Sequence, residues 1–117
     1  MRILRVWNRT RETLLADRAG LAGTSRERRT GLLRHAEFPR GEGLWIAPCE
    51  AVHTIGMKFP IDVLFLNRER SVLKIRHNMK QWRMAACLRA YSVLELPAGT
   101  AQSTGTEVGD RLEIENA

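Results

Sequence analysis

The chain has 117 residues, of which 44% are hydrophobic and 27% charged, and it carries a net charge of +6. This length and composition fit one globular domain over residues 1–117 and exclude a disordered chain. No apolar run is long enough for a membrane helix, no signal peptide is predicted, and two cysteines do not make a disulfide scaffold, so we expect a cytoplasmic protein with free thiols.

The positive charge is concentrated in two stretches. Residues 1–40 hold ten Arg against four acidic residues, and residues 68–89 hold seven basic residues against one Glu. Such stretches are typical of proteins that bind an anionic partner, and also of a merely basic surface. Because motifs that read bases are absent, an electrostatic nucleic-acid binder is only the second alternative function.

The first forty residues predict a hairpin and then a helix. Apolar residues within 3–7 and 12–16 indicate two short strands joined by a polar turn. Thr24 followed three residues later by Glu27 is the capping-box pattern that starts a helix, and Pro39 ends the apolar periodicity that follows. We therefore expect the main helix at about residues 25–36.

The middle of the chain predicts strands separated by breakers. Residues 44–46 indicate a short strand, and residues 52–57 an extended segment. Residues 61–66 are apolar except for Asp62, which is typical of a strand buried on both faces. Residues 71–76 alternate in polarity, as the hairpin partner of that strand should.

The last third predicts two further strands and a short helix. Residues 77–90 show no clear period and suggest an irregular excursion or a bulged strand. Strands are expected at 91–96 and 111–114, with a short second helix at about 98–104 between them. The predicted fold class is α+β and mostly β: a small antiparallel, barrel-like sheet with one main helix.

Several short pieces stand in a fixed order along the chain: ERRTGLL at 27–33, GEGL at 41–44, PC at 48–49, HTIGM at 53–57, PIDV at 60–63, WR at 82–83, VLELPAGTA at 93–101 and GD at 109–110. In their order and spacing these pieces resemble the DUF192 family of small bacterial and archaeal proteins of unknown function. The resemblance implies a compact, mostly β fold and brings no established activity. One departure is the turn at 67–70, where the family usually has an acidic or Asp-Gly-like turn.

Cys49 and His53 are the residues most suited to chemistry. A thiol within hydrogen-bond reach of an imidazole is the arrangement of Cys–His nucleophilic catalysis. The same two side chains, completed by Cys87, are also candidate zinc ligands, although the spacing matches no strong zinc motif. An enzyme or metal-binding protein using Cys49 and His53 is therefore the first alternative function.

A second set of candidates combines buried-strand carboxylates with nearby basic residues. Asp62 and Glu95 each interrupt an apolar run, so each carboxylate either faces water or points inward and needs a partner. Arg28 or Arg29 of the predicted helix could form a structural ion pair with one of them, which is the reading we favour slightly. With His53, the same groups could instead line a ligand pocket.

The sequence thus favours a non-enzymatic binding or accessory domain for a small ligand or a protein partner, with no cofactor expected. The candidate pocket residues are Arg28, Arg29, His53, Met57, Asp62, Trp82 and Glu95.

Overall fold

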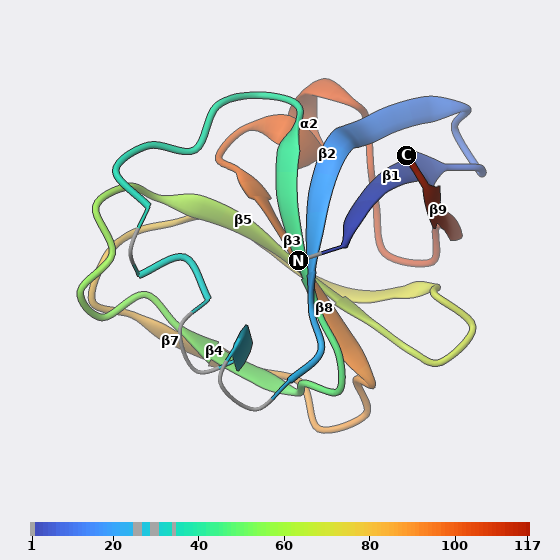
Figure 1. Ribbon diagram of the computed structural model, residues 1–117. Coiled ribbons are helices and arrows are strands. Elements are labelled where there is room, and N and C mark those ends of the chain that lie inside the picture. Colours follow the sequence, from blue (N-terminus) through green and yellow to red (C-terminus); the bar gives the residue numbers. More distant parts are fainter. Residues whose placement is uncertain (1, 25–26, 29–30, 34) are drawn as a thin grey trace.

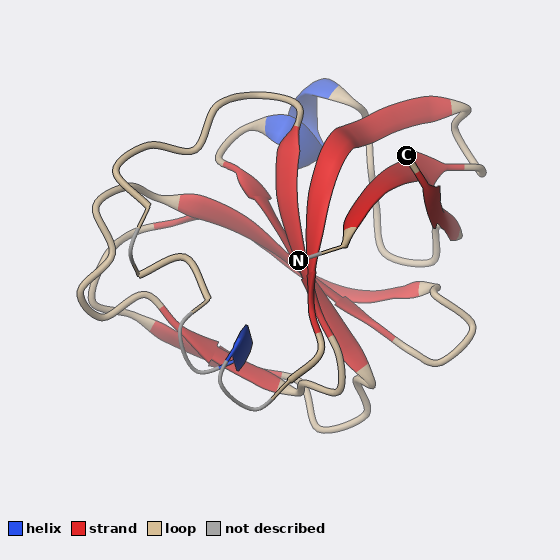
Figure 2. Cartoon of the chain, viewed as in Figure 1, coloured by secondary structure: helices blue, strands red, loops and turns tan. Residues whose placement is uncertain are grey.

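The computed structural model describes residues 2–24, 27–28, 31–33 and 35–117. A seven-stranded sheet, in the order β6-β5-β8-β3-β2-β1-β9, curls into a half-barrel, and β4 and β7 form a separate two-stranded sheet (Figures 1 and 2). The elements are β1 Ile3–Asn8, β2 Thr13–Ala22, β3 Glu42–Ile46, β4 Ala51–His53, β5 Ile61–Leu66, β6 Val72–Met79, β7 Met84–Ala86, β8 Ser92–Pro97, α2 Thr100–Ser103 and β9 Leu112–Asn116.

The predicted fold class is confirmed, with one difference in strand direction. The neighbours in the large sheet are antiparallel except β2 and β3, which are parallel, with Arg18 opposite Glu42 and Ala22 opposite Ile46. Parallel neighbours need a long crossover, and here residues 23–41 supply it. Because the mostly polar residues 23–41 separate the two strands, local sequence patterns do not reveal that β2 and β3 are parallel.

The prediction of an extended segment at 52–57 holds for residues 52–53 and was wrong for the rest. The strand β4 ends at His53, and Met57 closes a turn by donating its N–H to the Thr54 carbonyl at 3.1 Å. Gly56 adopts a φ of 83° in this turn, a conformation that is unfavourable for residues with a side chain.

The helix expected at about 25–36 includes residues 25–26, 29–30 and 34, which lie outside the described part of the chain. Residues 27–28 are helical, but residues 31–33 form a turn in which Gly31 has a φ of 47°, so the prediction that the helix continues to residue 36 was wrong. A glycine with positive φ is typical of a helix end. The capping pair at its start is confirmed: Glu27 N–H donates to Thr24 Oγ1 at 3.1 Å, and Thr24 N–H donates to Glu27 Oε1 at 3.0 Å. The second helix, expected at 98–104, is found as α2 at Thr100–Ser103.

The central strands β5 and β8 of the large sheet are buried on both faces, because the half-barrel fills one face and the connecting segments cover the other. On the central strand β8, Leu94 and Leu96 pack inside the half-barrel with residues of β1, β2 and β5. Val93 faces the opposite way and packs with Leu32, Met57 and other residues of the covering segments. The fully buried strand predicted at 61–66 is β5, which is buried at all six positions.

Candidate functional site

Glu95 lies in the middle of the sheet, on a strand buried along its whole length. It stands opposite Leu44 of β3 on one side and Val63 of β5 on the other. Side chains alternate along a strand, so Glu95 shares the face of Val93, toward the covering segments rather than the half-barrel. Only 4% of the residue is exposed.

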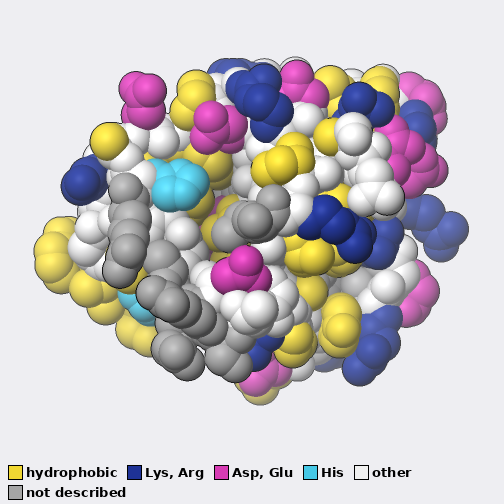
Figure 3. Space-filling view, in the orientation of Figure 1, with side chains coloured by type: hydrophobic (Ala, Val, Ile, Leu, Met, Phe, Trp, Pro, Cys, Tyr) yellow, Lys and Arg dark blue, Asp and Glu magenta, His cyan; other side chains and the backbone are white. Residues whose placement is uncertain are grey.

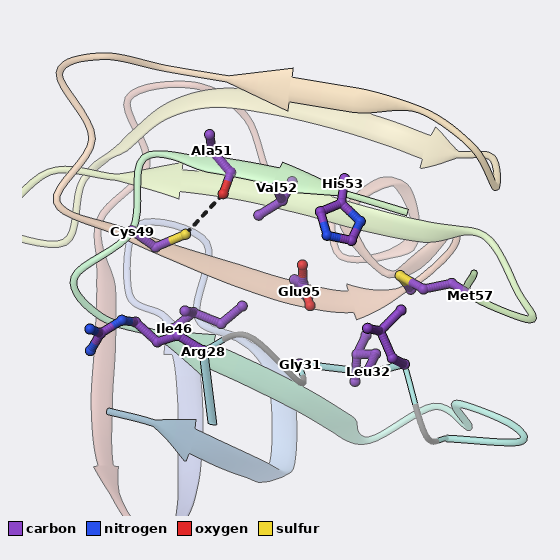
Figure 4. A pocket seen from close by; sticks show the side chains of 11 residues that line it. Arg28, Gly31, Leu32, Ile46, Cys49, Ala51, Val52, His53, Met57 and Glu95 are labelled. Atoms are coloured by element: carbon purple, nitrogen blue, oxygen red, sulfur yellow. Dashed lines mark hydrogen bonds between the residues drawn. The ribbon is translucent and has the colours of Figure 1, made fainter. Parts of the chain in front are cut away.

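A cavity of about 80 Å³ lies over this carboxyl group. Its described lining is apolar around Leu32, Leu33, Ile46, Val52 and Met57, with Arg28, Gly31, Cys49, Ala51, His53 and Glu95 completing it. Figure 4 shows the Glu95 carboxyl group between His53 of β4 on one side and Leu32 and Ile46 on the other. The volume corresponds to about two or three water molecules at ~30 Å³ each.

The Glu95 carboxyl group has no hydrogen bond or ion pair within the described part of the chain. Burial raises its pKa from 4.5 to about 8, because the charged form loses its hydration without gaining a partner. Glu95 is therefore mostly a neutral carboxylic acid at pH 7, able to donate one hydrogen bond and accept others. A buried polar group without a partner is rare in folded proteins and calls for an explanation.

Cys49 and His53 both border the cavity but do not contact each other as a catalytic couple. The Cys49 thiol donates to the Ala51 carbonyl, with 3.2 Å between Sγ and O. The His53 Nδ1 accepts the N–H of Ile55 at 3.2 Å, so the neutral ring carries its proton on Nε2. Burial raises the pKa of the Cys49 thiol, and the nearby Glu95 raises it further. The arrangement favours a protonated, weakly nucleophilic thiol.

Asp62 is buried as well, but its carboxylate binds backbone N–H groups at the start of α2 and does not line the cavity. Its Oδ1 accepts the N–H of Asn78 at 2.8 Å, and its Oδ2 accepts the N–H groups of Gly99 at 3.1 Å and Ala101 at 2.8 Å. Three backbone donors satisfy this carboxylate without a basic side chain. The slightly favoured arginine–carboxylate ion pair is thus not found at Asp62 or Glu95 among the described residues.

The remaining candidate pocket residues do not lie together at the cavity. Arg28 lines the cavity, and its Nη1 donates to the Gly23 carbonyl at 2.6 Å. Arg29 lies outside the described residues. Trp82 is 67% exposed and does not line the cavity, and its backbone has a left-handed φ of 63°.

The candidate metal ligands do not assemble in the described part of the chain. Cys49 and His53 line the cavity, whereas Cys87 packs against the neighbouring core. No group of three or more His, Cys, Asp or Glu side chains suited to a metal ion is present among the described residues. Both cysteines are free thiols.

Sequence reasoning missed most of the apolar lining. Ile46 and Val52 come from short strands that gave no sign of facing a cavity, and Leu32 was read only as the apolar side of a helix. The usable signal was Glu95 within Val93–Pro97, since a charged residue in a continuous apolar run predicts an unusual environment.

Three arginines of the N-terminal basic stretch form ion pairs with acidic residues near the C-terminal end of the sequence. Arg5 pairs with Glu115 at 3.3 Å, Arg9 with Glu113 at 3.1 Å, and Arg11 with Asp110 at 3.0 Å. Figure 3 shows basic and acidic side chains mixed along the edge where β1 and β9 lie in Figure 1. The antiparallel pairing of β1 with β9 sets Arg5 directly opposite Glu115 and brings the turn after β1 close to Asp110 and Glu113. The long separation in sequence concealed these pairs.

Comparisons with known proteins agree on the family and the fold. The DUF192 family, described as an uncharacterized ACR, matches residues 6–114. A UPF0127 protein of Pyrococcus furiosus is 36% identical over 81 residues, which are 64% of this chain and 69% of the relative. No helix among the described residues is long and apolar enough to cross a membrane.

Two solved structures share the fold. A protein of unknown function from Novosphingobium aromaticivorans superposes with a TM-score of 0.79 at 27% identity, over 95% of this chain and 83% of that one. A putative transcription regulator from Sinorhizobium meliloti gives a TM-score of 0.83 at 24% identity, over 96% and 92% of the two chains. At this identity the second similarity concerns the fold alone.

Proposed function

We propose that this chain, which belongs to the DUF192 family, is a non-enzymatic binding domain that receives the polar head group of a small ligand at Glu95. The observation that carries the proposal is the buried Glu95 carboxyl group, which faces a cavity and has no partner among the described residues. A ligand group that hydrogen-bonds this carboxyl would remove the cost of leaving it unpaired.

The size and lining of the cavity define the ligand. About 80 Å³ is well below the 300 Å³ or so of a site for a drug-sized molecule, so the cavity fits a head group rather than a whole metabolite. The apolar walls around Ile46, Val52 and Met57 favour a head group attached to a short apolar portion. His53 is exposed at the cavity, where its Nε2 is free of the Ile55 contact and available to the ligand.

The same geometry supports binding over nucleophilic catalysis. Cys49 donates to a carbonyl and His53 accepts from a backbone N–H, so neither activates the other. Nucleic-acid binding has less support because Arg5, Arg9 and Arg11 are paired with acidic residues of the C-terminal region.

Two broader features belong to the same proposal. The pairing of β1 with β9 joins residues near both ends of the chain into one sheet, which supports a single domain over residues 1–117. The free thiols Cys49 and Cys87 support a reducing compartment, the cytoplasm.

The proposal is tested with probes that differ only in the head group. Acetamide, ethylammonium, methylguanidinium and acetate are titrated against the ¹⁵N-labelled protein, following the amide signals of Val52 and His53. We expect saturable shifts with the head groups that donate hydrogen bonds. For the cationic probes, measured at pH 9 where Glu95 is ionised, the affinity of Glu95→Gln should be at least tenfold weaker. Glu50→Gln, the same change at an exposed residue of the neighbouring loop, should leave the affinity unchanged.

Absence of any saturable shift up to about 100 mM would remove the support for the site. Equal affinity in Glu95→Gln and the unsubstituted protein would show that any binding occurs elsewhere.

A further inference from the structure

A second recess lies between the β5–β6 turn and the strands β3 and β8. We call it the arginine groove and define it by Trp45, Asn67, Arg68, Arg70, Tyr91 and Ser92. Its volume is about 330 Å³, which reaches the range of small-molecule sites. It shares no described lining residue with the cavity at Glu95.

Two guanidinium groups are fixed in this groove by aromatic rings. The Arg68 Cζ lies 4.2 Å from the centroid of the Tyr91 ring, and the Arg70 Cζ lies 4.8 Å from the ring of Trp45. Stacking uses the flat face of a guanidinium and leaves its N–H edge available for carboxylate or phosphate oxygens. Of these donors, Arg70 Nη1 contacts the Ile114 carbonyl at 3.4 Å.

Neither guanidinium is neutralised by an acid. Arg68 and Arg70 form no ion pair within the described part of the chain, even though Glu69 stands between them in the sequence. This contrasts with Arg9 and Arg11, which pair with acidic residues. The arginine groove is therefore a concentration of unpaired positive charge in a concave site, which attracts anions.

The turn that carries the arginines is held in one conformation. Asn67 Oδ1 accepts the N–H of Ser71 at 2.9 Å, and the Asn67 carbonyl accepts the N–H of Arg70 at 3.0 Å. Arg70 has a φ of 65°, a left-handed conformation that is uncommon for residues with a side chain. Its carbonyl accepts the N–H of Leu112 at 2.9 Å, which ties the turn to β9. The positions of the two arginines are thus largely preorganised for a ligand.

Two more donors at the groove lack partners. The Trp45 Nε1 and the Ser92 Oγ are both buried without a hydrogen bond in the structure's described residues. Trp45 is 9% and Ser92 1% exposed, so water does not readily satisfy them. An unpaired buried donor is costly, but each of these atoms has less than 1 Å² of accessible surface, so a ligand in the groove contacts the residues and not these two atoms.

We propose that the arginine groove binds a small organic anion, in which a carboxylate or phosphate contacts Arg68 and Arg70 and a planar portion packs beside Tyr91 and Trp45. The groove volume and the two guanidinium groups that have no ion pair among the described residues favour this ligand chemistry. This site is separate from the cavity at Glu95, and the proposal does not depend on the function assigned there.

The test uses benzoate and phenyl phosphate as probes, with benzyl alcohol as the neutral counterpart. Binding is followed by the indole N–H signal of Trp45 in ¹⁵N spectra, identified by its loss in Trp45→Phe. We expect saturable shifts with both anions, none with benzyl alcohol, and an affinity that falls as salt is added. The ratio of the two anion affinities tells a carboxylate site from a phosphate site.

The double variant Arg68→Gln/Arg70→Gln should bind both anions with at least tenfold lower affinity. Arg83→Gln removes one positive charge, as Arg68→Gln does, from an exposed residue whose guanidinium contacts only backbone carbonyls among the described residues, and it should change the affinity less than twofold. Should the double variant fold poorly, Arg68→Gln alone changes an exposed residue and should weaken binding at least threefold. Equal losses in Arg83→Gln and the groove variants would indicate unspecific charge attraction and overturn the proposal, as would unchanged Trp45 signals.

Discussion

Replacing Glu95 with glutamine should make the protein more stable at neutral pH, with a gain that disappears in mild acid. The folded-state pKa of this carboxyl is about 8, against 4.5 ordinarily. Between these values the folded chain holds a proton that the unfolded chain has released, so the free energy of unfolding falls as the pH rises.

The expected size follows from this interval. Each pH unit above 4.5 costs about 1.4 kcal/mol, so the penalty at pH 7 amounts to about 3 kcal/mol, and it levels off above the folded pKa of about 8. Glutamine has nearly the same shape and does not titrate. The free energy of unfolding of Glu95→Gln should therefore be about 3 kcal/mol higher than that of the unsubstituted protein at pH 7, and about equal to it at pH 4.

The assay is urea denaturation followed by tryptophan fluorescence at each pH from 4 to 8. Glu50→Gln, a change at an exposed glutamate, should run parallel to the unsubstituted protein over the whole range. A constant offset between Glu95→Gln and the unsubstituted protein, or a loss of stability at pH 7, would refute the argument that this carboxyl is buried without a partner.

Three further predictions concern the other polar groups. Asp62→Ala should lower the free energy of unfolding by about 3 kcal/mol or more in urea denaturation, because it leaves the N–H groups that bind this carboxylate unpaired. Asp17 is half-buried and its carboxylate pairs only with the exposed Arg18 among the described residues, so Asp17→Ala should cost under about 1 kcal/mol; equal costs would contradict the role of Asp62. Burial acts to raise the pKa of Asp110, but hydrogen bonds from Arg11 and Asn8 outweigh it and keep the pKa below the ordinary value. The resulting stability is present above the ordinary pKa of 3.8 and is lost as the pH falls below it, so Asp110→Asn should flatten the acid limb of the unfolding profile; an unchanged limb would exclude this contribution. In Cys87→Ser, the remaining Cys49 thiol should react with a disulfide reagent at pH 7 at least tenfold more slowly than a free cysteine, whereas a faster reaction would revive the nucleophile hypothesis.

The strands were the most predictable part of the fold. Apolar runs and alternating patterns located β5, β8 and the β5–β6 hairpin, because a strand's own side chains report which of its faces are buried. The Thr24–Glu27 pair was recognisable for a similar reason, since a helix cap involves neighbouring residues only.

The roles of the two buried acids depended on distant partners. Asp62 and Glu95 look alike in sequence, each within an apolar strand. In the structure, Asp62 meets backbone donors at the start of α2, while Glu95 faces a cavity under Leu32 and His53. The difference arises from which segment covers each position, and no local pattern encodes it.

The sequence by itself determined the family, the mostly β class, the positions of the central strands and the unusual carboxylate at Glu95. Only the tertiary structure decided that Asp62 is satisfied and Glu95 is not, and that Arg68 and Arg70 share a groove with Trp45 and Tyr91. The physical reason is that propensity and periodicity act over a few residues, whereas desolvation and pairing depend on contacts between residues far apart in the chain.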